Sequence, residues 1–464
     1  MKLFFIEHIN NMKIIYKDKT AVRWMGKGLF ASLAILLAGT ANAAQLSPDL
    51  RQLDRVPLAV AAVPIIDKAL LEATPRKDRP YTFAVPTSVD LRQGDGVWSD
   101  VSPGLVHWRA RIAAPGATML HFRLNHVALP NNAELWVYDS GGKTVQGPYT
   151  SADILGGELR TADIVGDVGI VEVRMASNDK PKFTINVADV RYGIRKSLKF
   201  GVFPQSGSCE VDVACSQGDQ YRSEIRSVAM LTYDTSTTSD ECSGALVNDV
   251  PQDGQPYIFT ARHCGITSSI APELTVYWLD QKASCGSGSE DLSHPQQHAT
   301  FVTNDSASDF TLIKMNSPPP SDANVYYSGW DVSDTPPQCG VGIHHPSADA
   351  KKISIYKQAA TAQQVDTPAI QAWQVFWARG VTEQGSSGSG LWDSNHHIVG
   401  VLHGGGSDCT HQSEPDYYGR LGVAWSNNSA LRNALDPNDT GAVHLCGRNP
   451  GDAVDPNCAT TSVV

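Results

Sequence analysis

Three short segments of the chain carry side chains of the types that acyl transfer through a serine requires. In chain order these segments contain His263, Asp309 and Ser387. Catalysis by a serine nucleophile needs a base for the hydroxyl proton, a carboxylate that orients the base, and N–H donors for the oxyanion. The three segments offer one candidate for each of these side-chain roles.

The candidate base, His263, stands in residues 260–265, directly after the strand-like run 257–259. Cys264 follows it, and Cys242 lies one short loop upstream. A bridge between these cysteines would clamp the loop that holds the imidazole, and closing a loop of this size is worth roughly 3 kcal/mol in the chain-entropy model. A lone histidine is more often an ordinary core or surface residue, but the cysteine and the partners described next favour a catalytic base.

The candidate carboxylate, Asp309, opens the apolar run 310–313, which predicts a strand that enters the core. A carboxylate at this place can accept from an imidazole and hold its tautomer. An aspartate at a strand end is more often a cap or a turn residue, and Asp305 is the nearest rival. The residues alone leave this choice open.

The candidate nucleophile, Ser387, lies in the Gly/Ser-rich segment 385–390. Glycines beside a serine allow a sharp turn that exposes its Oγ. They also let the N–H groups of Gly385 and Ser387 point together into an oxyanion hole. A flexible Gly/Ser loop is the alternative. The segment stands between residues 380–382 and the apolar strand 398–402, inside a folded region, which favours a structured turn.

Taken together, these segments resemble the chymotrypsin-like serine peptidases, and more closely the bacterial lysyl endopeptidases. The resemblance covers roughly residues 201–440 and rests on an ordered set of motifs: residues 260–265, 308–313, 343–346, 382–390 and 402–420. It implies an all-β fold with a double β-barrel catalytic domain. It also implies His263 as general base, Asp309 as its orienter and Ser387 as nucleophile, in an enzyme that needs no cofactor.

The resemblance also bears on substrate choice, because Asp416 matches the acid at the base of the family's specificity pocket. A buried carboxylate in an apolar slot is unfavourable until a cation pairs with it. We therefore expect cleavage after lysine, with arginine as a second candidate. Glu414 and Asp408 are rivals for the same role.

The resemblance assigns His403, Gly404 and Gly405 to the strand that pairs with substrate backbone beside the pocket. A histidine there can instead select acidic side chains, so a glutamyl-type peptidase of the same fold is an alternative, against which Asp416 argues. The family's tryptophan that stacks on this histidine is absent from residues 361–368, although Trp373 and Trp377 stand closer to Ser387. Gly390 also replaces the family's proline.

All nine cysteines lie after position 200, and an exported chain meets the oxidising conditions in which disulfides form. The resemblance implies the pairs Cys209–Cys409, Cys215–Cys285 and Cys242–Cys264. Three further cysteines remain: Cys339, Cys446 and Cys458. We expect one of them to stay without an intrachain partner, with Cys339–Cys446 as the candidate pair.

The amino terminus has the pattern of an export signal, which predicts a signal peptide over residues 1–43. A basic region precedes the apolar run 28–38, which is too short to span a bilayer, and residues 41–43 form a small-x-small cleavage motif. We expect a secreted protein, extracellular or periplasmic in transit, with no membrane segment after signal removal. An uncleaved anchor is the alternative, and Met12 and Met25 are alternative starts.

The remaining chain divides by pattern into a propeptide over residues 44–199, a serine peptidase domain over residues 200–445 and a tail over residues 446–464. Alternating strand patterns such as 170–175 predict a small β-sandwich at about 95–193. The resemblance implies that the propeptide aids folding and blocks the active site. Lys196 and Lys199 in the basic connector are the expected self-cleavage positions. A permanent sandwich module that binds carbohydrate is the alternative.

Composition limits the partners of this chain. A net charge of -11 argues against nucleic acid, which needs clustered Lys and Arg, and suits protein or peptide substrates with basic side chains. The histidine pairs 344–345 and 396–397 lack the spacing of a zinc helix, so we expect no metal. We expect a monomer. A non-catalytic secreted binding protein on this fold is the rival from another functional class.

Overall fold

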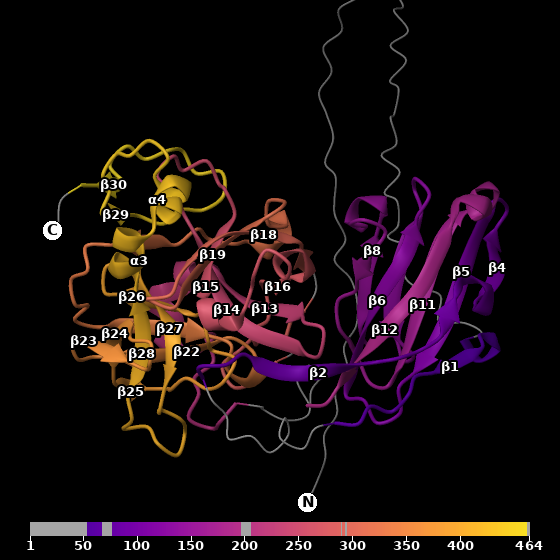
Figure 1. Cartoon of the computed structure of the whole chain (residues 1–464), viewed down its shortest axis with the longest axis horizontal. Coiled ribbons are helices and arrows are strands. Elements are labelled where there is room, and N and C mark those ends of the chain that lie inside the picture. Colours follow the sequence, from indigo (N-terminus) through magenta and orange to yellow (C-terminus); the bar gives the residue numbers. More distant parts are fainter. Residues whose placement is uncertain (1–52, 67–76, 196–205, 289, 293–294, 462–464) are drawn as a thin grey trace, which may run out of the picture. The chain divides into compact units, whose positions relative to one another are not determined.

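The computed structural model describes residues 53–66, 77–195, 206–288, 290–292 and 295–461, which belong to one compact unit, Pro48–Val464 (Figure 1). The predicted signal peptide and the expected self-cleavage positions Lys196 and Lys199 lie outside the described residues, as does most of a helix expected around residues 65–72. No helix in the described ranges is long and apolar enough to cross a membrane.

The amino-terminal half is a β-sandwich, as predicted. One sheet contains β1 (Leu58–Val60), β4 (Val97–Ser102), β5 (Leu105–Ala113), β7 (Glu134–Asp139), β8 (Val145–Tyr149) and β11 (Val168–Ala176). The other contains β2 (Tyr81–Thr87), β3 (Leu91–Arg92), β6 (Met119–Ala128), β9 (Leu159–Arg160), β10 (Ile164–Val165) and β12 (Thr184–Gly193). Apolar side chains of both sheets, including Trp108, Phe122 and Val173, form one buried cluster. The sandwich begins at Leu58, upstream of the expected start near residue 95.

Both faces of strand β11 are buried. Val171, Val173 and Met175 enter the core, as the pattern predicts. The polar residues between them are buried as well, because Glu172 accepts hydrogen bonds from Tyr138 Oη at 2.7 Å and from Arg174 Nε at 2.6 Å. Paired polar groups can line a buried face, and periodicity does not reveal such pairs.

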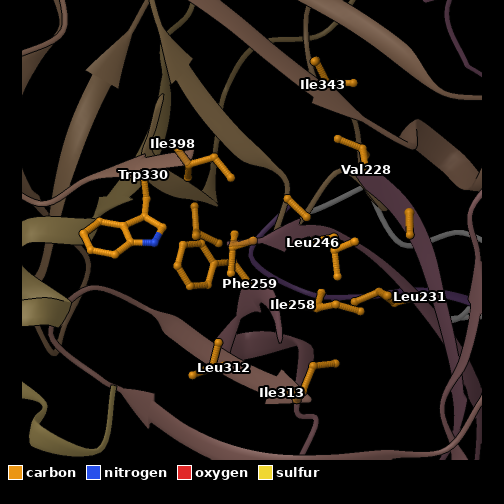
Figure 2. Packing of buried hydrophobic residues seen from close by; sticks show 14 of the residues in the cluster. Val228, Leu231, Leu246, Ile258, Phe259, Leu312, Ile313, Trp330, Ile343 and Ile398 are labelled. Atoms are coloured by element: carbon orange, nitrogen blue, oxygen red, sulfur yellow. The ribbon is translucent and has the colours of Figure 1, made fainter. Parts of the chain in front are cut away.

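The first barrel of the carboxy-terminal half is antiparallel. Its strands are β13 (Val228–Asp234), β14 (Ser239–Val247), β15 (Tyr257–Ala261), β16 (Thr275–Tyr277), β17 (Gln296–Gln297), β18 (Ala299–Asp305) and β19 (Phe310–Met315). Aliphatic and aromatic residues on these strands, such as Ile258, Phe259 and Leu312, pack into one core (Figure 2). Trp330 and Ile398 from the second sheet join the same cluster, so the two barrels share packed side chains (Figure 2).

The second barrel is built from an 11-stranded sheet. It contains β20 (Gly329–Asp331), β21 (Gly340–His344), β22 (Lys352–Tyr356), β23 (Thr361–Val365), β24 (Ile370–Val375), β25 (Trp377–Arg379), β26 (Gly390–Asp393), β27 (His397–Gly405), β28 (Asp416–Arg420), β29 (His444–Leu445) and β30 (Ala459–Thr460). The prediction of an all-β, chymotrypsin-like double barrel is confirmed. Residues 446–461 of the expected tail are part of this body, since β30 pairs with β29.

Helices are short and few among the described residues. The α-helices are α2 (Arg222–Ile225), α3 (Leu421–Asn427) and α4 (Ser429–Leu435). The 3-10 helices are η1 (Leu53–Arg55), η2 (Gln93–Asp95), η3 (Ser151–Asp153), η4 (Ser177–Lys182), η5 (Ser216–Tyr221), η6 (Arg262–Cys264), η7 (Ala271–Glu273), η8 (Ser321–Ala323) and η9 (Pro346–Ala348). Asn428 is the N-cap of α4, and its side chain accepts from the Leu431 amide at 3.1 Å.

Strand β2 connects the sandwich to the first barrel. It pairs with β12 on one side and with β14 on the other, where Tyr81 lies opposite Glu241 and Ala84 lies opposite Ser239. One 13-stranded sheet therefore runs through both halves of the chain. The chain immediately before β2 is consequently delivered to the peptidase half.

Four disulfides stabilise the carboxy-terminal half: Cys209–Cys409, Cys215–Cys285, Cys242–Cys264 and Cys446–Cys458. The first three join the pairs that the resemblance implied. The expected Cys339–Cys446 pair is wrong, because the pairing of β29 with β30 brings Cys446 and Cys458 to a Cα separation of 5.0 Å. Cys339 is a free, partly buried thiol.

Candidate active site

The loop after β15 holds His263 against Asp309. His263 lies in η6, next to the Cys242–Cys264 disulfide, and its Nδ1 is 2.5 Å from Asp309 Oδ2. Its backbone N–H also donates to Asp309 Oδ1 at 2.9 Å, so the carboxylate fixes both the ring and the loop. Asp305, the rival acid, instead accepts from the amide and hydroxyl of Ser308.

The ionisation of Asp309 follows from these contacts. Burial alone would raise the pKa of this carboxyl, but the hydrogen bonds and charges of His263 and then His403 outweigh burial. The pKa of Asp309 is therefore held well below its ordinary value, and the group is a carboxylate wherever the peptidase would work.

The loop that carries Ser387 packs directly on the two strands that precede His263. The Ser243 amide donates to the Ser387 carbonyl at 2.8 Å. Gly388 has a positive φ of 83°, and a Cβ there would lie 2.3 Å from Thr260 Oγ1, so only glycine fits. This packing places the serine beside the base.

The link between base and nucleophile is open in this structure. His263 Nε2 is buried and has no hydrogen-bond partner among the described residues. Ser387, expected to be exposed, is 0% exposed, and its hydroxyl donates to the carbonyl oxygen of Lys77 at 2.5 Å. The carboxylate–imidazole pair is thus formed, whereas the serine proton points to another acceptor.

The segment before Ser387 presents two backbone donors. Gly385 has a φ of 96°, and its carbonyl accepts from Ser243 Oγ at 3.0 Å. The N–H groups of Gly385 and Ser387 meet no protein acceptor in the part of the chain that the structure describes. Two unused donors beside a hydroxyl are what an oxyanion hole requires.

His344 holds this loop from behind. Its Nδ1 lies 2.8 Å from Ser386 Oγ and its Nε2 lies 3.1 Å from Ser354 Oγ. Burial, reinforced by the charges of Lys77 and Lys352, lowers the pKa of His344 to about 3. A neutral imidazole therefore positions the loop. From the sequence, the side chain of His344 had been considered only as a possible metal ligand.

Asp416 is a buried carboxylate surrounded by hydrogen-bond donors. The residue is 0% exposed, and its Oδ2 accepts from Trp377 Nε1 at 2.7 Å, Thr382 Oγ1 at 2.7 Å and Ser407 Oγ at 2.5 Å. Of the rival acids, Glu414 is exposed, and Asp408 is half-buried and pairs with His411. The donors Trp377, Thr382 and Ser407 escaped sequence reasoning, although two of them stand inside the quoted motifs.

The side chain of Lys77 reaches this buried carboxylate. Its Nζ lies 2.8 Å from Asp416 Oδ1 and 2.9 Å from Ser407 Oγ. Gly405 leaves room for the carboxylate, since a Cβ there would lie 2.3 Å from Asp416 Oδ1. A Cβ on Gly404 would lie 3.3 Å from the Asp78 amide, so this strand borders the segment that enters the site.

His403 lies behind Asp309. Its Nδ1 is 2.6 Å from Asp309 Oδ2 and its Nε2 is 2.6 Å from Asp366 Oδ2. Burial would lower its pKa, but the hydrogen bonds and charges of Asp309 and Asp366 raise the pKa of His403 to about 9. Asp366 was missed by the sequence analysis, which noted only that its segment lacks a tryptophan.

His263, Asp309 and His403 also form a group of potential metal ligands. Within the described ranges, atoms of His263, Asp309 and His403 lie within 4.8 Å of one another. Both Nδ1 atoms already face Asp309 Oδ2, so the set is a hydrogen-bonded chain that belongs to the serine site.

Part of the sequence is similar to a known peptidase family. Residues 203–419 match the family model described as the lysyl endopeptidase C-terminal domain. The lysyl endopeptidase of Pseudomonas aeruginosa is 29% identical over 346 residues, which cover 67% of this chain and 71% of that protein.

Solved peptidase structures match parts of this chain at low similarity. The Rv3671c protease of M. tuberculosis in its active form has 17% identity and a TM-score of 0.33 over 51% of this chain and 92% of its own. The MamO protease domain of Magnetospirillum magneticum has 16% identity and a TM-score of 0.30 over 45% and 99%. The fold therefore rests on the strand pairing described above, and residues 203–419 are similar to the C-terminal domain of lysyl endopeptidases, which supports a serine endopeptidase.

Proposed function

We propose that this chain is the precursor of a secreted serine endopeptidase that hydrolyses peptide bonds after lysine. One observation carries the proposal. The ammonium group of Lys77 lies 2.8 Å from Asp416 while the carbonyl of the same residue lies 2.5 Å from Ser387 Oγ. A single lysine residue thus spans the distance from the buried acid to the nucleophile, as a residue at the cleaved bond must.

The proposed reaction follows the acyl-enzyme route. Ser387 Oγ attacks the peptide carbonyl carbon, and His263 Nε2 takes its proton while Asp309 holds the ring. The amides of Gly385 and Ser387 stabilise the oxyanion. His263 then protonates the leaving amine, the C–N bond breaks, and a water molecule hydrolyses the ester without any cofactor.

The hydrogen bonds around Asp416 favour lysine over arginine. Its Oδ2 already accepts from Trp377, Thr382 and Ser407, which leaves mainly Oδ1 for a ligand. A compact ammonium can use one carboxylate oxygen together with Ser407 Oγ. A guanidinium binds best through two parallel hydrogen bonds to both oxygens, which this pocket does not leave free.

Cleavage-site mapping with the secreted, processed protein tests the proposal. A peptide pool that contains Lys, Arg and Glu sites should be cut after Lys first and after Arg more slowly. Cuts after Glu would establish the glutamyl alternative and refute the role of Asp416. The Ser387→Ala variant should leave the pool intact, and residual cutting at the same sites would refute Ser387 as the nucleophile.

The same proposal covers processing and location. We propose that residues 1–43 direct export, that residues 44–199 are a propeptide removed after Lys199 or Lys196, and that the product is a monomer outside the cell or in the periplasm. Four disulfides suit an oxidising compartment. Intact mass and amino-terminal sequencing of the secreted product, with its elution volume on size exclusion, test each of these statements.

A further inference from the structure

The segment that enters the candidate site comes from the amino-terminal half of the same chain. Lys77 is only 7% exposed, and beyond it the Pro80 carbonyl accepts from Gln384 Nε2 at 2.9 Å. A lysine is buried this deeply only where an acid pairs with it, and here Asp416 does so. The contacts therefore continue along residues 77–80 and include both side chain and backbone.

The peptide bond between Lys77 and Asp78 is bound in a non-reacting arrangement. The Ser387 hydroxyl donates its proton to the Lys77 carbonyl oxygen, while His263 Nε2 stays without a partner among the described residues. Attack requires the opposite arrangement, in which the base takes this proton and the oxygen lone pair faces the carbonyl carbon. The segment blocks the site while the Lys77–Asp78 peptide bond is not arranged for attack by Ser387.

The chain after this bond is anchored independently of the pocket. Residues of β2 pair with both β12 and β14, and Thr82 Oγ1 donates to Asp240 Oδ1 at 2.6 Å. If Ser387 did acylate, the C–N bond would break and the Asp78 amine would receive the proton. That amine would stay tethered beside the ester at high effective concentration and could re-form the peptide, returning the hydroxyl to Ser387.

We infer that Lys77 is a built-in pseudosubstrate, through which the amino-terminal half keeps the uncut chain latent by occupying the lysine pocket and the nucleophile together. This inference rests on the proposed function, because it takes the Asp416 pocket as the lysine site. It predicts that loss of the Lys77 side chain opens the pocket while the rest of the precursor stays assembled.

Binding to the full chain in a Ser387→Ala background tests the inference, since this background cannot cut itself. The probe is a fluorescein-labelled peptide that ends in a lysine carboxylate, followed by fluorescence anisotropy. The parent should bind it weakly, and Lys77→Ala should tighten binding at least tenfold. Lys143→Ala, which removes an exposed lysine from the same sandwich, should match the parent.

Two outcomes separate failure of this inference from failure of the proposed function. Equal, tight binding of the probe by the parent and by Lys77→Ala would overturn the pseudosubstrate alone. A preference of Lys77→Ala for a peptide ending in glutamate would overturn the lysine pocket itself. Lys77→Met keeps the apolar stem and removes the charge, so it repeats the test if Lys77→Ala fails to fold with its four disulfides.

The chain with an intact Ser387 supplies a kinetic test of the tether. Intact mass measures cutting after Lys77, and a chromogenic lysine amide measures activity in the same samples. We expect activity to stay low in any molecules cut only at this bond and to appear when the amino-terminal half dissociates. Activity that rises in step with the Lys77–Asp78 cut would overturn the role of the tether.

Discussion

Asp366 binds the far side of His403, with 2.6 Å between Asp366 Oδ2 and His403 Nε2. On its other side the same imidazole reaches Asp309, which also binds His263. The carboxylate that orients the base therefore carries a second, cationic neighbour. An ion pair with Asp366 therefore covers the side of His403 that faces away from Asp309.

From this arrangement we predict that the Asp366→Asn variant loses activity and stability at a lower alkaline pH than the wild type. The pKa of His403 is raised to about 9. The protonated ring therefore contributes its full stabilisation below the ordinary pKa of about 6.5. This contribution is lost as pH rises through about 9. Without the Asp366 charge the proton should leave roughly one pH unit earlier. The alkaline limbs of kcat/KM and of thermal stability should both move to lower pH.

Asp439→Asn is the matched control for that shift. Asp439, like Asp366, is an exposed aspartate with a positive φ, at 49° and 65° respectively, and asparagine tolerates this conformation. Its pH profile should equal that of the wild type. An unchanged alkaline limb in Asp366→Asn would show that the ion pair does not act on the site.

Replacing Asp309 by asparagine should lower kcat by about 10⁴-fold with little change in KM. The carboxylate accepts from both Nδ1 atoms at Oδ2 and from the His263 backbone N–H at Oδ1, whereas an amide has only one acceptor oxygen, so the tautomer of His263 is no longer fixed. Steady-state kinetics on a lysine ester measure the loss. The Asp309→Asn/Ser387→Ala double variant should be no slower than Ser387→Ala alone, because the two residues act as a unit; additive losses would contradict that.

Trp377→Phe should relax the preference for lysine. The change keeps an aromatic ring but removes the Nε1 donor from Asp416 Oδ2, which frees that oxygen for a guanidinium. The ratio of kcat/KM for lysine and arginine amides should fall about tenfold, mainly through better use of arginine. Trp373→Phe loses an N–H bond to the Val399 carbonyl instead, so its ratio should stay at the wild-type value.

The disulfide missed by the sequence analysis should stabilise the carboxy-terminal end. Cys446 and Cys458 enclose a loop with a sequence separation of 12, worth about 3 kcal/mol in the chain-entropy model. Urea unfolding of the Cys446→Ser/Cys458→Ser variant should show a loss of this size, with kcat/KM unchanged at low denaturant. Labelling of the native wild type should modify one thiol per chain, Cys339; a second labelled thiol would refute the pairing.

Local motifs explain why much of the site was visible in the sequence. His263, Asp309 and Ser387 each stand at a strand end or sharp turn, and such turns need particular residues nearby, as Gly388 does beside Thr260. Asp416 opens its strand in a similar way. Short-range patterns of this kind can be recognised in the sequence because the local backbone conformation requires particular residues.

The residues that escaped prediction depend on long-range pairing instead. Lys77 reaches Asp416 only because β2 joins β14 in a register that no local pattern encodes. Asp366 meets His403 only because the β23–β24 hairpin returns to β28, next to β27. Both are ordinary polar residues in their own segments, so their importance appears only when the sheets are assembled.

The pairing of β2 with β14 has one more consequence. If the amino-terminal half is removed as proposed, the backbone of residues 239–241 will have N–H and C=O groups without a partner on that side. A free edge in a stable sheet can take up any extended polypeptide through main-chain hydrogen bonds alone. The processed enzyme would thereby bind the substrate segment after the cleaved bond through its main chain, regardless of side chains. Such binding suits a peptidase whose specificity depends on the single residue at the cleaved bond.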